Sequence, residues 1–102
     1  MNKAEAYRAT LRALDEWEPY LLRESGLPGP RGNLELMEAV ADLASRDQIE
    51  QLLTWDAGRA PTNDPHEFLA ACGTFGLGRL LVEGDRTALT RLRRLASDPR
   101  WP

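Results

Sequence analysis

Hydrophobic residues recur at three- and four-residue spacing along most of the chain, which is the spacing of amphipathic α-helices. The first such segment places its apolar positions at Ala4, Tyr7, Leu11, Leu14 and Trp17. Charged residues fill the positions between them, so one face is marked for burial and the other for water. Applied to the whole chain, the pattern predicts helices over residues 3–17, 19–25, 34–45, 48–55, 65–83 and 86–97.

The segment 65–83 differs from the others because it is apolar on most of its sides. Asp64 can cap it, Pro65 suits the first helical position, and Glu67 stands where a capping box places its acid. Phe75 and Val82 belong to one apolar face, and Leu69 and Leu80 to another. A helix with this pattern is usually surrounded by other helices. We therefore expect both faces of this central helix to be buried.

Three glycines lie inside the central segment, at Gly73, Gly76 and Gly78. Each one costs a helix about 1 kcal/mol relative to alanine. Close packing can offset that cost, because a glycine lets a neighbouring helix approach the backbone. We expect a neighbouring helix to lie against all three positions.

Turn residues divide the helical segments into pairs. Residues 26–32 contain three glycines and two prolines, so no helix can continue through them. Asn33 can cap the helix that follows, Asp47 the next, and Asp85 the last, after Gly84 ends the central helix. Asp47 and Asp85 are 38 residues apart, close to the period of two-helix repeats, which is about 40 residues. The predicted fold class is therefore all-α, with stacked antiparallel helical hairpins.

Residues 63–68, 73–81 and 92–101 resemble the beginning of bacterial HEAT-repeat proteins. The final Asp98-Pro99-Arg100-Trp101 is similar to the turn that leads into a further HEAT helix. The resemblance implies a HEAT-like α-α superhelix and the N-terminal portion of a longer solenoid. It also implies a scaffold or adaptor that binds a protein partner and has no catalytic activity. Some HEAT-like proteins are DNA alkylation repair enzymes, so the alternative is a nucleic-acid-binding module.

Charge is distributed unevenly over the chain, which has a net charge of −3. Residues 1–83 carry 8 basic and 14 acidic side chains, whereas residues 84–102 carry 5 basic and 2 acidic ones. The candidate partner surface is accordingly Arg86, Arg91, Arg93, Arg94, Arg100 and Trp101. These arginines either form a solvated outer face or contact phosphates of a nucleic acid. An isoelectric point near 5.1 argues against a dedicated DNA-binding protein.

The same end of the chain offers a route to self-association. In a longer solenoid, further repeats would normally cover Leu89, Leu92 and Trp101. When those repeats are absent, this end of the chain can pair with another copy. The sequence thus leaves open a protein partner, a nucleic acid and a second copy of the chain.

Residues for catalysis, metals or cofactors are sparse. Cys72 is the only cysteine and His66 the only histidine, so zinc-ligand spacing is absent and we expect no metal. The glycines of the central helix do not follow a strand, so we expect no dinucleotide cofactor. Cys72 and the tryptophans Trp17 and Trp55 are interpreted as packing residues.

Acidic residues stand beside the two internal tryptophans, and these are the only places where the sequence indicates a cleft. Glu16 and Glu18 flank Trp17, and Asp56 follows Trp55. No apolar run is long enough to span a bilayer, and the N-terminal residues do not lead into a signal peptide. We expect a cytoplasmic protein without membrane contact.

Overall fold

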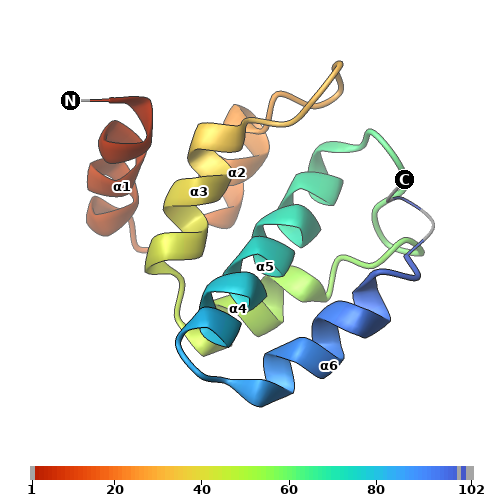
Figure 1. Cartoon of the computed structure of the whole chain (residues 1–102). Helices are drawn as coiled ribbons and strands as arrows, with labels where there is room; N and C mark the ends of the chain where they lie inside the picture. Colours follow the sequence, from red (N-terminus) through yellow and green to blue (C-terminus); the bar gives the residue numbers. More distant parts are fainter. Residues whose placement is uncertain (1, 99, 101–102) are drawn as a thin grey trace.

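The computed structural model describes residues 2–98 and Arg100, and over these residues the only regular elements are helices (Figure 1). Their bounds are α1 (Lys3–Ala13), α2 (Glu18–Glu24), α3 (Leu34–Leu43), α4 (Arg46–Leu53), α5 (Pro65–Val82) and α6 (Arg86–Leu95). The prediction of an all-helical chain is confirmed for this described part. Within it, no helix combines the length and the apolar character needed to cross a membrane.

Helix α1 is shorter than the hydrophobic spacing predicts, since it ends at Ala13 and not near Trp17. Leu14 has extended backbone angles, so Leu14 and Trp17 lie in the linker to α2. The Trp17 indole Nε1 donates a hydrogen bond to the Leu11 carbonyl, at 3.0 Å. This bond folds the linker back onto the end of α1, so the apolar spacing continues while the helix does not.

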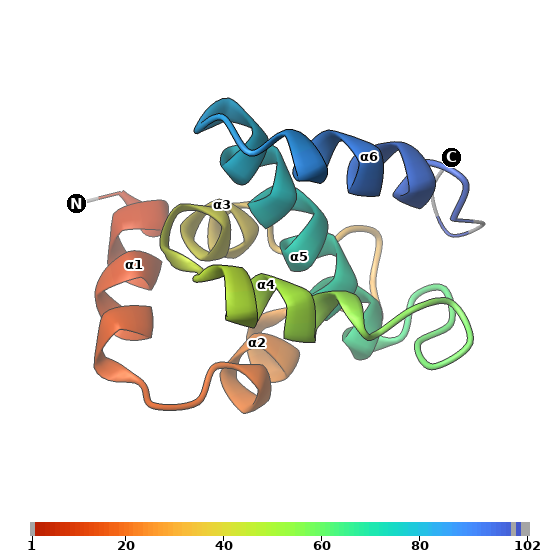
Figure 2. The ribbon, with the colours of Figure 1, turned by 90° about the horizontal axis from the view of Figure 1, so that it is seen from below.

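Helix α5 lies at the centre of the arrangement and packs against α2, α3, α4 and α6. Helix α1 packs against α3, so α1, α3 and α5 lie side by side in that order (Figure 1). Figure 2 shows α2 and α4 on one side of α5 and α6 on the other. The chain therefore places its most apolar helix where most of the other helices can cover it.

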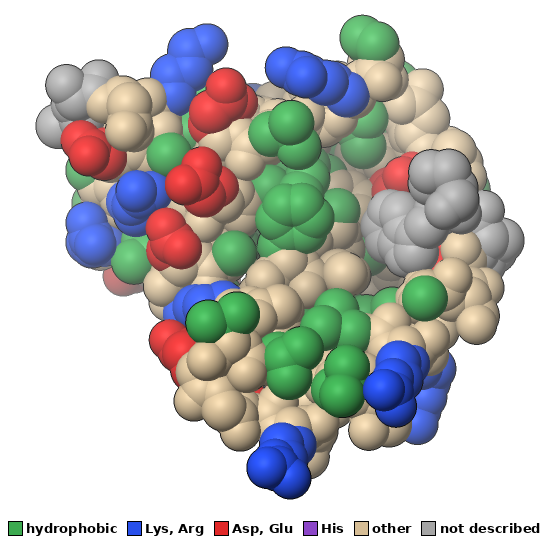
Figure 3. Space-filling model, viewed as in Figure 1, with side chains coloured by type: hydrophobic (Ala, Val, Ile, Leu, Met, Phe, Trp, Pro, Cys, Tyr) green, Lys and Arg blue, Asp and Glu red, His purple; other side chains and the backbone are tan. Residues whose placement is uncertain are grey.

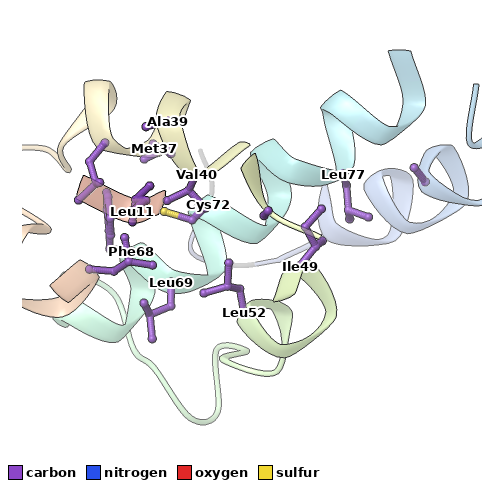
Figure 4. Packing of buried hydrophobic residues seen from close by; sticks show 14 residues of the cluster. Leu11, Met37, Ala39, Val40, Ile49, Leu52, Phe68, Leu69, Cys72 and Leu77 are labelled. Carbon is purple, nitrogen blue, oxygen red and sulfur yellow. The ribbon is translucent and has the colours of Figure 1, made fainter. Parts of the chain in front are cut away.

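The hydrophobic core surrounds α5 (Figure 4). Phe68, Leu69, Cys72 and Leu77 of α5 are almost completely buried, and they meet Leu11, Val40, Ile49 and Leu52 from other helices. Burial raises the pKa of the Cys72 thiol, because the thiolate would be desolvated there. A neutral, inaccessible thiol agrees with the interpretation of Cys72 as a packing residue.

Side chains cap the helices at the positions that the sequence indicates, with one exception. Asn33, Asp64 and Asp85 each accept a backbone N–H of the helix that follows. Glu67 accepts the backbone N–H of Asn63. Gly84 takes a φ of +103° at the end of α5, where a residue with a Cβ atom would be strained.

The exception is α4, whose cap is Ser45 and not Asp47. Ser45 Oγ accepts the Gln48 N–H at 3.1 Å, and the Gln48 side chain accepts the Ser45 N–H at 2.8 Å. These two bonds form a complete capping box, which satisfies two backbone donors at once. Asp47 is displaced into the first turn, where its charge still favours the helix N-terminus.

Candidate interaction surface

The glycines of α5 do not all face the same neighbour. A Cβ atom at Gly73 would be 2.9 Å from Leu53 Cγ, and one at Gly76 would be 2.7 Å from Ile49 Cγ1. Both contacts are with α4, so two of the three positions are tightly packed as expected. At Gly78 the expectation is wrong, because no neighbouring atom of the described chain lies within 4 Å of an added Cβ.

Gly78 belongs to a side of α5 that the other described helices leave uncovered. At about 100° per residue, Ala71, Phe75, Gly78 and Val82 project within about 60° of one another. Phe75 is 49% exposed and Val82 is 87% exposed. The expected burial of this apolar face is therefore wrong. Neighbouring helices cover the other sides of α5, and this side stays in contact with water.

Exposed hydrophobic side chains continue from α5 onto the helices beside it. Leu34 of α3 is 46% exposed and Leu89 of α6 is 38% exposed. Figure 3 shows hydrophobic side chains gathered over α3, α5 and α6 around a hollow in the surface. We call this surface the open face. It consists of Leu34, Phe75, Gly78, Val82 and Leu89, and it is bordered by charged residues of α3 on one edge and of α6 on the other.

The two edges of the open face carry opposite charges. Helix α3 contains the acids Glu35, Glu38 and Asp42 and no basic residue, whereas α6 contains four arginines and no acid. Figure 3 shows acidic side chains along α3 and basic side chains along α6. Glu38 follows Leu34 by one helical turn, and Arg86 and Arg93 stand one turn before and after Leu89. Asp42 already pairs with Arg8 of α1, at 3.3 Å, so the acids of α3 without an ion pair in the described part of the chain are Glu35 and Glu38. Each edge thus combines a hydrophobic residue with helix charges of one sign.

The arginines singled out by the sequence differ in their exposure and in their partners. Arg86, Arg93 and Arg94 are exposed on α6. Arg91 instead bonds both carboxylate oxygens of Glu50 in α4, at 2.7 and 2.9 Å. Trp101 lies outside the described residues. The arginines of this group that are exposed are therefore Arg86, Arg93 and Arg94.

Arg100 is buried, with a side chain only 3% exposed. Its Nη1 donates to the carbonyls of Trp55 and Ala60, at 3.0 and 2.8 Å, and its Nη2 lies 2.7 Å from Asp98 Oδ2. The hydrogen bond from Arg100 lowers the pKa of Asp98, because it favours the charged carboxylate. Arg100 thus fastens the C-terminal turn to the loop between α4 and α5.

A second concave region lies where α2 and its linker meet α4. Glu16, Trp17 and Glu18 line a cleft of about 450 Å³ together with Gln48, Gln51 and Leu52. Glu18 and Gln51 also border an adjoining cleft of about 620 Å³, which Glu50, Trp55 and Arg59 line as well. The acidic and aromatic neighbours Glu16, Glu18 and Trp17 do border a cleft, as the sequence indicates.

Asp56 has a local structural role and does not line either cleft. Its Oδ1 accepts the backbone N–H groups of Gly58 and Arg59, at 3.0 and 3.1 Å. The Trp55 ring contacts His66 at a centroid distance of 4.5 Å, and the Arg59 guanidinium stands 4.1 Å over it. Trp55 therefore packs within its own chain, as interpreted from the sequence.

The structure adds Leu34, Phe75, Gly78 and Val82 to the residues that the sequence singles out for binding. Leu34 lies apart from the buried residues of α3, which are Leu36, Met37, Ala39, Val40 and Ala41. An apolar residue outside such a stripe is the signal that the sequence offered for Leu34. Among residues 2–98 and Arg100, no group of three or more His, Cys, Asp or Glu side chains is placed to hold a metal ion. Comparison of the chain with protein-family models, curated proteins and solved structures yields no match.

Proposed function

We propose that this chain is a protein-interaction module and that it binds a protein partner through the open face. The observation that carries the proposal is the exposure of Phe75 and Val82 on the central helix, together with that of Leu34 and Leu89 on the helices that pack against it. Isolated exposed hydrophobic residues are common on protein surfaces, but adjoining ones on three helices indicate an interaction site.

Burial of this face would be energetically favourable. Removing a valine or phenylalanine side chain from water contributes about 1.5–3 kcal/mol when burial is complete. Val82 is 87% exposed and would gain most of that amount, and Phe75 would gain about half. Hydrophobic residues at the centre with charged residues at the rim are also the usual anatomy of a protein interface.

The proposal includes a HEAT-like stacking of helical hairpins and assigns the chain no catalytic activity. The order of α1, α3 and α5 supports it, because stacked hairpins place their first helices side by side. Of the three predicted hairpins, α5 and α6 pack against each other, whereas α2 and α4 pack mainly against α5 and not against the helices that precede them. In such an array the binding surface runs across several helices, as the open face does.

Site-specific photo-crosslinking in the native host cell tests the proposal. A photoreactive phenylalanine analogue at Val82, which is 87% exposed, should give a covalent adduct with a second protein chain. The same analogue at Ala9, exposed on α1, is the matched control and should give none. The crosslinked protein, once identified and purified, should bind the wild-type chain and lose at least about tenfold in affinity for Phe75→Ser. Absence of an adduct at Val82 would refute the proposal.

A further inference from the structure

We infer that the open face binds a second copy of the same chain, in a two-fold symmetric dimer that places α3 of one copy over α6 of the other. This inference rests on the proposed function, because it names the occupant of the same surface. Two features of the open face support such a dimer, namely the charges at its two edges and the uncovered glycine between them.

The charges at the edges are complementary under two-fold symmetry. When two identical faces meet about a two-fold axis that runs between the two edges and parallel to them, each edge of one copy lies over the opposite edge of the other. With the axis along the exposed side of α5, the acids Glu35 and Glu38 of one copy face Arg86 and Arg93 of the other. The contact occurs twice, and every pair of edges joins opposite charges. An arrangement that placed α3 over α3 would instead oppose acid with acid.

The centre of the open face allows the close approach that such a dimer needs. Phe75 and Val82 flank Gly78 on the uncovered side of α5, and no neighbouring atom of the described chain lies within 4 Å of an added Cβ at Gly78. Gly73 and Gly76 have α4 against them, and Gly78 lacks such a neighbour within the described chain. In the dimer, α5 of the second copy lies against Gly78, and Phe75 and Val82 pack against their counterparts.

A dimer of standard size would use a moderate part of the surface of the chain. A standard interface buries about 800 Å² on each partner. The chain has 6139 Å² of accessible surface, so the dimer would use about one eighth of it.

Sedimentation velocity on the purified 102-residue chain, from low to high micromolar concentration, tests the dimer directly. We expect a monomer–dimer equilibrium that weakens as the salt concentration rises, since charged edges contribute to it. Val82→Glu should weaken the dimer at least about tenfold, because it buries a charge at the centre. Ala9→Glu is the matched control on α1 and should leave the equilibrium unchanged.

A charge exchange tests the geometry of the dimer. The variant Glu35→Arg/Glu38→Arg places arginine over arginine, and the variant Arg86→Glu/Arg93→Glu places acid over acid, so each should be monomeric alone. Mixing the two restores opposite charges at both edges, and a heterodimer should form with an affinity within about tenfold of the wild type. Glu38, Arg86 and Arg93 are exposed and Glu35 is partly buried, and circular dichroism should show unchanged helix content.

Several outcomes would overturn the inference. A wild-type chain that stays monomeric at every concentration contradicts it, and so does a mixture of the two charge variants that does not associate. A Val82 adduct in the cell that contains a different protein, with a monomeric purified chain, would refute the dimer and leave the proposed function standing. A monomeric chain without any Val82 adduct would refute both.

Discussion

Gly76 of α5 lies so close to Ile49 of α4 that a Cβ atom added to the glycine would be 2.7 Å from Ile49 Cγ1. Gly78, two residues later, has no such neighbour within the described chain. The same residue type in one helix therefore has two roles. At Gly76 it permits the packing of α4, and at Gly78 it leaves the outer surface of α5 flat.

We predict opposite effects of alanine at these two glycines. Gly76→Ala should lower the free energy of unfolding by about 1–3 kcal/mol, because Ile49 must shift in a packed core. Gly78→Ala should raise it by up to about 1 kcal/mol, because alanine favours the helix and meets open space. Chemical denaturation at low micromolar concentration, where the monomer is measured, checks both. An equal effect of the two substitutions would show that α4 does not lie where the structure places it.

The sequence predicts the helices well because their signals are local. Asn33, Asp64 and Asp85 each lie within a few residues of the backbone groups that they cap. The exception at α4 arose because Ser45 and Asp47 both suit a cap, and only the observed bonds between Ser45 and Gln48 decide between them.

The exposure of the candidate residues depended on contacts between distant parts of the chain. Arg91 bonds Glu50, which is 41 residues away, and Arg100 bonds the Trp55 carbonyl, which is 45 residues away. Spacing along the sequence carries no information on such pairs. For the same reason, the apolar faces of α5 were recognised, but the pattern could not show that Phe75 and Val82 lie on the uncovered one.

We predict that the cap of α4 depends on Ser45 and not on Asp47. Ser45→Ala removes the acceptor of the Gln48 N–H and should lower the free energy of unfolding by about 1 kcal/mol. Asp47→Ala removes only an exposed acid from the first turn and should change it by less than about 0.5 kcal/mol. Thermal and urea denaturation of the two variants make the comparison. A larger loss for Asp47→Ala would restore Asp47 as the cap.

We predict that Arg79 of α5 stabilises the end of α3. Its Nη1 donates to the Asp42 carbonyl at 2.8 Å and its Nη2 to the Ala44 carbonyl at 2.6 Å. The last carbonyls of a helix lack partners within the helix, and a cation there also favours the helix dipole. Arg79→Met should lower the free energy of unfolding by about 1–3 kcal/mol.

Arg79→Lys is the informative control for this bond pair. Lysine keeps the charge but lacks the planar fork that reaches both carbonyls. Its stability should lie between those of the wild type and Arg79→Met, and amide hydrogen exchange should be faster in the last turn of α3. A lysine variant as stable as the wild type would show that charge alone is sufficient.

The pair of Asp98 and Arg100 makes part of the stability depend on pH. The hydrogen bond from Arg100 lowers the pKa of Asp98 in the folded chain below its usual value of 3.8. The folded state therefore holds the Asp98 carboxylate more strongly than the unfolded state does. This contribution is complete above the unfolded pKa and disappears as the pH falls through the folded one.

Comparison of the wild type with Asp98→Asn across the acidic range measures this contribution. Asparagine cannot ionise, so the wild type should be the more stable of the two at neutral pH. The difference in the free energy of unfolding should shrink steadily below the usual aspartate pKa of 3.8 and vanish once Asp98 is protonated in both states. Arg100→Gln should lose about 1–3 kcal/mol at neutral pH, because the Trp55 and Ala60 carbonyls also lose their donor. A difference between the wild type and Asp98→Asn that did not change with pH would exclude the ion pair as its source.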